Sequence, residues 1–353
     1  MIQKTSIGPT LQAILAAGLF GASAPLSKLL LVDIPPVMMA GLLYLGSGIA
    51  ALLASRLRGW ILPKDAEARL SRADLPWLLA ALLTGGVAAP ILLMVGLAGT
   101  PGATASLLLN FESVSTTLIA ALIFREAIGN RLWIALALIT LASILLSWHP
   151  ADAWGFSWLA VAVLGACLLW GLDNNFTRHI SARDPLAIVA IKGLGAGTFS
   201  FVLSVVLGES FPALPTALTA MLVGAVCYGA SIALFVLAMR GLGAARTGTL
   251  FASAPFIGVL LSLLILRETP GLSFYLATPL MLVGVIVLLV EDHAHLHTHE
   301  FLEHEHAHVH DAHHPHSHGV IHHHNHPHRH ETNTHSHNHA PDLHHRHRHS
   351  DRR

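Results

Sequence analysis

The pentapeptide LIFRE at residues 122–126 returns with a single change as LILRE at residues 264–268, which is 142 residues further along the chain. Each copy ends an apolar segment that starts with small residues, at 102–105 and at 243–247, and each is followed by one more apolar segment. A repeat of this length holds five membrane-crossing helices. Because five is an odd number, the two copies would enter the membrane in opposite directions. We therefore predict an inverted repeat, a plan common among secondary transporters.

Apolar segments of membrane-crossing length make up most of the chain. The 353 residues are 53% hydrophobic and 11% charged, and the mean hydropathy is +0.60. A helix of roughly 18–25 apolar residues crosses the ~30 Å hydrocarbon layer of a bilayer. The sequence therefore predicts an all-α membrane protein with ten transmembrane helices, at 11–31, 36–54, 76–97, 102–124, 131–148, 156–178, 186–208, 217–239, 244–266 and 273–290.

Lysine and arginine are distributed unevenly between the predicted loops. With the N-terminus in the cytoplasm, thirteen of them before residue 292 lie inside, and only Lys28 and Arg267 lie outside. This bias predicts a multi-pass protein of the inner (plasma) membrane with both termini in the cytoplasm. The formal net charge of zero argues against nucleic acid as a partner. The expected partners are the lipid bilayer, a small solute and transition-metal ions, and a homodimer stays open.

Several short motifs recur in the second half of the chain at corresponding places. They are Gly21 with Lys28, Gly171 with Arg178, Arg125 with Glu126, and Arg267 with Glu268. The first two pairs share a seven-residue spacing, and the last two pairs close the predicted fourth and ninth helices.

On these motifs the chain resembles the drug/metabolite transporter superfamily, in its ten-helix form with two EamA-type repeats. The resemblance covers about 11–291, which gives a first repeat at 11–148 and a second at 156–291, with five transmembrane helices each. It implies a secondary carrier, often an exporter, without an ATP site. It leaves the substrate open, because members of the superfamily handle amino acids, nucleotide-linked sugars, drugs and other metabolites.

Glu112 lies about halfway along the predicted fourth helix. An ionised carboxylate at that depth is costly unless it is paired or hydrated. One interpretation is a ligand for a substrate cation or a carrier of protons, and the other is a carboxylate buried against a Ser, Asn or Arg partner. The equivalent position in the second repeat is Ala254, so the two halves differ at this point.

Asp173, Asn174 and Asn175 form a second polar cluster, in the predicted sixth helix. Their carboxylate and carboxamide suit a hydrated cation or an amino group, and the alternative is a polar helix end. We expect Asn110, Asp173 and Asn174 to line a site around Glu112. Pro25 and Pro255 interrupt helices and free backbone carbonyl groups, so we expect both beside the transport pathway.

The remaining polar residues of the bundle favour structural roles. The Arg-Glu pairs at 125–126 and 267–268 occur at opposite membrane faces, which favours a helix-end function. Lys28 is expected to extend toward the membrane surface, with a place in the site as the alternative. Cys167 and Cys227 are either ligands of a thiophilic metal or small packing residues.

The C-terminal segment has a different chemistry. Residues 293–353 hold 25 of the 27 histidines and cannot build an apolar core, so they predict a disordered cytoplasmic tail. Imidazole suits Zn, Ni and Co, and the absence of cysteine disfavours Cu(I). The alternative is a solubilising tail that is merely rich in histidine. The first candidate metal ligands are His293, His295, His297, His299, His304, His306, His308, His310, His313, His314, His316 and His318.

These features predict a secondary transporter that exports a small solute by rocking of its two five-helix halves. The solute is either Ni, Co or Zn delivered by the tail, or an amino acid or other metabolite, with the tail as a metal sensor or buffer. A metal-buffering protein with a membrane anchor is a third hypothesis, although an anchor needs only one helix. We expect no required cofactor and no enzymatic activity, because the predicted bundle has no nucleophile–base or His-x-x-x-His motif.

Overall fold

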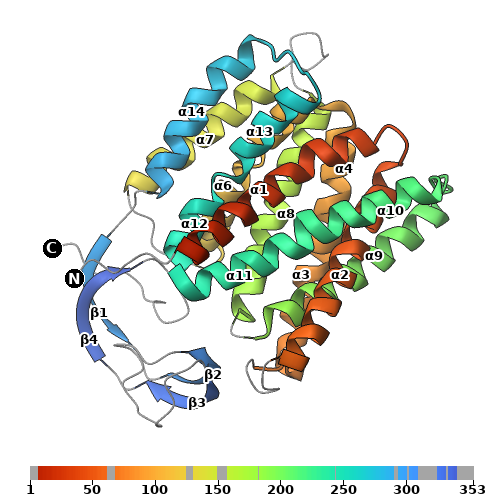
Figure 1. Cartoon of the computed structure of the whole chain (residues 1–353). Helices are drawn as coiled ribbons and strands as arrows, with labels where there is room; N and C mark the ends of the chain where they lie inside the picture. The colour runs from red at the N-terminus through yellow and green to blue at the C-terminus, as the bar shows by residue number, and fades with distance from the viewer. Residues whose placement is uncertain are drawn as a thin grey trace.

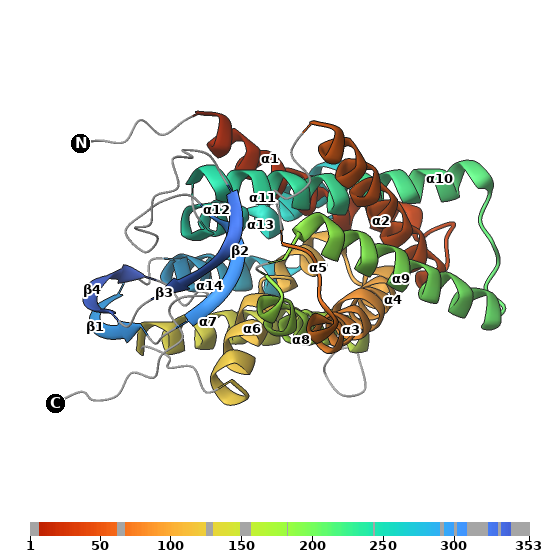
Figure 2. The ribbon, with the colours of Figure 1, turned by 90° about the horizontal axis from the view of Figure 1, so that it is seen from below.

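The structure is a computed structural model of the chain, and it describes residues 7–61, 68–124, 130–148, 157–181, 183–242 and 244–289 together with four strands between 293 and 339. The first six ranges form one helical bundle (Figures 1 and 2). Within the described ranges, eight helical segments are long and apolar enough to cross a membrane, and two further apolar helices are shorter. The prediction of an all-helical membrane bundle is confirmed at this level of about eight to ten apolar helices.

The first half of the bundle contains two uninterrupted helices, two interrupted ones and a shorter final helix. These elements are α1 (Ile7–Leu30), α2 (Pro36–Ile61), the series η1 (Arg72–Asp74), α3 (Leu75–Ala81), η2 (Leu82–Ala88) and α4 (Ala89–Gly99), the pair α5 (Gly102–Leu108) and α6 (Phe111–Leu122), and α7 (Asn130–Ser147).

The second half follows the same order. Its elements are α8 (Trp158–His179), α9 (Pro185–Val206), the series α10 (Leu214–Val223), η3 (Gly224–Ala230) and α11 (Ser231–Leu242), the pair α12 (Ala244–Phe251) and α13 (Ala254–Ile265), and α14 (Leu272–Leu289).

The interruptions fall at equivalent places in the two halves. The segments η2 and η3 are both π-helical, and their bounds differ by 142 residues. The breaks between α5 and α6 and between α12 and α13 have nearly the same offset. A π-helical turn carries an extra residue and often marks a functional site. The repeat seen in the sequence therefore extends to the irregularities of the backbone.

Helices of the two halves interleave. In the first half, α1 packs against α11 and α13, and in the second half α8 packs against α4 and α6. In addition, α2 packs along α9 and α7 packs along α14, and the two helices of each pair lie side by side in Figure 1. Rocking of the two five-helix halves stays a prediction. Each half is packed mainly against the other, so such a motion would have to break contacts between α2 and α9 and between α7 and α14.

Two glycines of the repeated motifs permit this interleaving. A Cβ added at Gly21 would overlap the carbonyl oxygen of Ala254 and lie 3.1 Å from the backbone nitrogen of Gly258. A Cβ added at Gly171 would lie 2.7 Å from the Cβ of Ser115. Each glycine thus brings a helix of one half into backbone contact with a helix of the other, as small residues do in membrane bundles.

The histidine-rich tail contains strands. β1 (His293–His299) pairs antiparallel with β4 (Asn333–His339), and β2 (Leu302–His308) pairs antiparallel with β3 (His324–His330). The disorder of the tail at residues 293–353 stays a prediction. Within the four strands histidine alternates with other residues, and this period of two matches a β-strand.

The strands contain part of the predicted ligand set. The candidate ligands within them are His293, His295, His297 and His299 in β1 and His304, His306 and His308 in β2. The candidates that lie outside the described residues are His310, His313, His314, His316 and His318.

We expect the Gly21→Ala and Gly171→Ala variants each to lower the free energy of unfolding by about 1–3 kcal/mol, because the added methyl group forces packed backbones apart. Gly18→Ala is the matched control in α1, since a Cβ there meets nothing within 4 Å. Thermal unfolding of the purified protein in detergent measures the effect. Equal stability of all three variants would contradict the close helix crossing.

Candidate functional site

Glu112 lies in the first turn of α6, directly after the break that follows α5. Its side chain is partly buried, and its Oε1 accepts a hydrogen bond of 2.8 Å from Asn174 Nδ2 on α8. Asn174 Nδ2 also lies 3.1 Å from Thr116 Oγ1, one turn further along α6. Glu112 and Asn174, which the sequence predicted to share a site, are thus in direct contact between the two halves.

Asp173 forms an ion pair. Both of its carboxylate oxygens accept hydrogen bonds from Lys192 Nζ on α9, at 2.6 and 2.7 Å, and Thr177 Oγ1 donates a third bond of 2.9 Å. The two charged side chains are 10% and 15% exposed, so the pair is largely removed from solvent. Breaking one partner of such a pair leaves an uncompensated buried charge. Asp173 therefore neutralises Lys192 beside Glu112.

The π-helical turn η2 packs directly against this ion pair. A Cβ added at Gly85 would overlap the Asp173 carboxylate, so only glycine leaves room for it. The Gly85 carbonyl oxygen accepts hydrogen bonds from Tyr44 Oη at 2.8 Å and from Trp170 Nε1 at 3.0 Å. One residue of η2 thereby positions side chains of α2 and α8.

Four aromatic side chains form a chain of ring contacts near this ion pair. The ring of Tyr44 lies 5.9 Å from that of Tyr228, which lies 5.8 Å from Phe20, and Phe20 lies 5.3 Å from Phe251. Tyr44 also donates to the carbonyl oxygen of Gly85, the residue packed against the Asp173 carboxylate. These rings therefore lie in the same part of the bundle as the Asp173–Lys192 ion pair.

The other predicted site residues have different surroundings. The Asn110 side chain is buried and donates to the Leu107 carbonyl oxygen at 3.0 Å, so it is bound within its own turn. Pro255 is the second residue of α13, directly after the break that corresponds to the one beside Glu112, and Pro25 lies inside α1. The prolines thus lie on the two helices that cross at Gly21.

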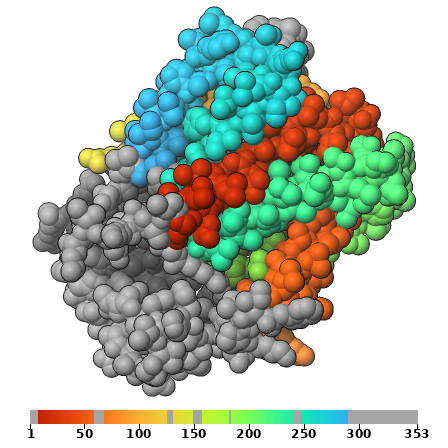
Figure 3. Space-filling view, viewed as in Figure 1, coloured from red at the N-terminus to blue at the C-terminus, as the bar shows by residue number. Residues whose placement is uncertain are grey.

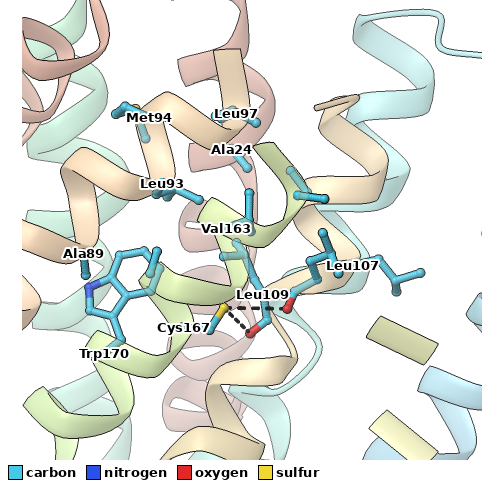
Figure 4. Close-up of a cluster of buried hydrophobic side chains, with 14 of the residues drawn as sticks. Ala24, Ala89, Leu93, Met94, Leu97, Leu107, Leu109, Val163, Cys167 and Trp170 are labelled. Carbon is cyan, nitrogen blue, oxygen red and sulfur yellow. Dashed lines mark hydrogen bonds between the residues drawn. The ribbon is translucent and has the colours of Figure 1, made fainter. Parts of the chain in front are cut away.

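Cys167 is a packing residue at the break between α5 and α6. It is fully buried among Val163, Trp170 and other apolar side chains, and its Sγ donates to the Leu108 carbonyl oxygen at 3.7 Å (Figure 4). Among the residues that the structure describes, no group of three or more His, Cys, Asp or Glu side chains could hold a metal ion. This arrangement agrees with the packing interpretation of Cys167.

At the end of the bundle where α1 finishes, polar side chains bind helix ends. Lys28 Nζ donates to the carbonyl oxygens of Leu97 and Ala98 at the end of α4, at 2.7 and 2.9 Å. The Glu268 carboxylate accepts hydrogen bonds from the backbone N–H groups of Gly102 and Ala103, which begin α5. The helix-end interpretation of Glu268 is confirmed, and the helix that it caps belongs to the other half. The Arg125–Glu126 pair lies outside the described residues.

At the opposite end, ion pairs join the halves. Arg58, near the end of α2, is paired with Asp184, and Arg183 Nε lies 2.9 Å from the Asp74 carboxylate. Both ends of the bundle are therefore bridged by polar contacts between the first and second halves.

Sequence reasoning missed Lys192. It counted this residue only as a positive charge near the cytoplasmic face. The available signal was its place inside the apolar run that forms α9, since a lysine there needs a partner in the bundle. Tyr44 and Gly85 carried no comparable signal, because tyrosine and glycine are common in membrane helices.

Comparison with known proteins gives an independent view. The model of the EamA-like transporter family matches residues 9–148 and 157–290. An uncharacterized transporter of Methanothermobacter thermautotrophicus is 30% identical over 283 residues, covering 76% of this chain and 82% of the relative. The uncharacterized inner membrane transporter YedA of Escherichia coli K12 is 26% identical over 264 residues, covering 72% and 81%. A solved structure titled "Crystal structure of protein" matches with a TM-score of 0.57 at 20% identity, over 79% of this chain and 95% of that one, which shows a shared fold.

We expect Asp173→Asn to lower the free energy of unfolding by about 3 kcal/mol, because it leaves the Lys192 ammonium group buried without a counter-charge. The Asp173→Asn/Lys192→Gln double variant removes both charges and should recover much of that loss. Reversible unfolding in mixed micelles measures both. If the double variant loses as much unfolding free energy as the Asp173→Asn and Lys192→Gln variants lose together, the two residues are not coupled.

Proposed function

The chain belongs to the EamA-like transporter family, and on that premise we propose that it is a secondary transporter that exports a small solute through a site built on Glu112 and Asn174. It is a multi-pass protein of the inner membrane with homologues described as transporters. Such a carrier needs no resident cofactor. The homologues are not described as enzymes, and we propose transport as the function of this chain.

The contact between Glu112 and Asn174 carries this proposal. Asn174 is exposed although it lies in a membrane-crossing helix, and Glu112 beside it is partly accessible. Polar side chains at such positions face a bundle interior or a water-filled passage rather than lipid, and they mark transport sites. The helix break before Glu112 and the π-helical turn beneath Asp173 add irregular backbone of the kind that lines substrate sites.

Ten transmembrane helices in two inverted repeats remain part of the proposal. The equal offsets of η2 and η3 and of the two helix breaks support it. The distribution of thirteen inside and two outside basic residues supports cytoplasmic termini. Because the halves interleave, we propose that alternating access moves mixed groups of helices and exchanges the polar contacts at the two ends of the bundle.

For the tail, we propose a metal-binding function. The strand register places histidine opposite histidine, in the pairs 293–339, 295–337 and 297–335 of one ribbon and 304–328, 306–326 and 308–324 of the other. Directly opposed residues of an antiparallel pair have Cβ atoms about 5 Å apart, and alternate residues share a face. Histidine is a ligand that suits Zn, Ni or Co. A tail that senses or buffers metal fits this register better than a tail that feeds a metal pathway, because the described bundle offers no matching ligands.

We expect Glu112→Gln to abolish coupling of solute flux to an imposed proton gradient, because the amide can neither release a proton nor hold a cation. The measurement is solute uptake into proteoliposomes with and without an imposed proton gradient, with a panel of amino acids, other metabolites, organic cations and Ni, Co and Zn. Glu209→Gln is the matched control, since this carboxylate lies at a bundle end, where it accepts hydrogen bonds from the Met38 N–H group and from Ser204 Oγ. If no compound in the panel moves faster than in protein-free liposomes, the transport proposal fails.

The tail is expected to bind several Zn, Ni or Co ions per chain at pH 7.5, and to lose most of this binding below about pH 6.5, where imidazoles become protonated. Removal of residues 293–353 should abolish the binding and leave the bundle folded. Isothermal titration of the full and shortened chains measures both. Binding that survives the truncation, or that is unchanged at pH 5.5, would contradict the proposal.

A further inference from the structure

Three charged side chains lie near one another on α6, α8 and α9, since Glu112 binds Asn174 and Lys192 binds the preceding residue, Asp173. Asp173 and Lys192 neutralise each other through two hydrogen bonds, at 2.6 and 2.7 Å. Glu112 has no ion pair among the described residues, and its hydrogen bond comes from Asn174, the residue that follows Asp173 on α8. With Glu112 ionised, the group carries one net negative charge. A bound solute that compensates this charge must bring one positive charge.

The surfaces around this charge are aromatic. Tyr44 and Phe20 are partly accessible, and both are in ring contact with the buried Tyr228. Trp170 lies one helical turn before Asn174 on α8, which places the two residues on the same helix face. The faces of aromatic rings attract organic cations, and the attraction grows when the cation is desolvated. The site thus combines one carboxylate with apolar surfaces that favour a cation.

The same centre is a poor ligand set for a divalent metal ion. Both Asp173 oxygens are occupied by Lys192, which leaves Glu112 as the available carboxylate. The other polar partner is an amide, and the described residues contain no cluster of metal-ligating side chains. Zn, Ni and Co prefer imidazole or thiolate ligands. The thiol of Cys167, which lies on α8, is fully buried in the apolar core and directs its Sγ to the Leu108 carbonyl oxygen.

We infer that the Glu112 site recognises an organic ammonium solute that carries one positive charge on an apolar or aromatic body, and that it excludes divalent metal ions. This inference rests on the proposed transport function and names the substrate class of its site. Lys192 determines the specificity, because it cancels the second carboxylate and so limits the site to a single compensating charge.

The test uses the purified full chain in detergent micelles and radiolabelled benzyltrimethylammonium in equilibrium dialysis. We expect saturable binding of the probe to the wild type. Glu112→Gln should weaken it roughly tenfold or more through the loss of the charge contact. Tyr44→Leu should weaken it about threefold to tenfold through the loss of the aromatic face. Glu209→Gln should bind like the wild type, and thermal unfolding verifies that each variant is folded.

Competition separates the substrate classes. Unlabelled benzyltrimethylammonium should displace the probe, whereas phenylacetate and Ni²⁺ should not. Ni²⁺ bound by the histidine tail does not affect this readout, because only displacement of the probe is counted. In the Lys192→Met variant, where both carboxylates are free, Ni²⁺ should begin to compete. The Asp173→Asn/Lys192→Met variant, which restores a single negative charge, should again resist Ni²⁺.

The inference is overturned if the probe does not bind saturably, if Glu112→Gln binds it as well as the wild type does, or if Ni²⁺ displaces it from the wild type. These failures are distinct from a failure of the proposed function. Glu112-dependent flux of an anionic or neutral solute without probe binding would refute the substrate class and retain transport. Saturable probe binding with no flux of any solute would retain the site and refute transport.

Discussion

Helices from opposite halves of the chain meet in backbone contact at Gly21 and Gly171, and the arrangement of the polar centre follows from these crossings. The first glycine holds α1 against α13, and the second holds α8 against α6. The second crossing sets Asn174 beside Glu112, at 2.8 Å, within one turn of the contact. A side chain at either glycine would separate the helices, because close approach in a bilayer depends on small residues rather than on a hydrophobic driving force.

The low dielectric of the membrane explains why the charged side chains of the bundle are paired or bound to helix ends. Asp173 and Lys192 are paired where Gly85 leaves room for the carboxylate, because burying either charge without the other is costly. At the bundle ends, Lys28, Glu209 and Glu268 bind free backbone groups of helix termini in place of water. Glu112 stands apart from this pattern, because an amide is its hydrogen-bond partner and no cation pairs with it in the described residues. A carboxylate that the fold leaves uncompensated is the group on which binding and coupling can act.

The tail and the bundle have separate chemistries. Histidine recurs with a period of two in the tail and is placed opposite histidine in both ribbons, whereas the polar centre of the bundle combines a carboxylate, an amide and aromatic rings. The cations proposed for the two parts differ in kind, a transition-metal ion for the tail and an organic ammonium ion for the bundle. A metal sensor or buffer attached to an organic-solute carrier is consistent with both, because neither set of ligands supplies what the other would need.

The sequence by itself determined the membrane class, the apolar helices and the duplication, because hydropathy and the return of LIFRE as LILRE are local properties of the chain. It also identified Glu112, Asp173 and Asn174, since polar residues inside apolar runs are conspicuous. Only the tertiary structure decided that Asp173 belongs to Lys192, that Asn110 is bound within its own turn, and that the two halves interleave. Those outcomes depend on contacts between residues far apart in the chain, as between Gly171 and Ser115. The hydrophobic pattern indicates that a helix lies in the membrane, but it does not indicate which helix packs against it.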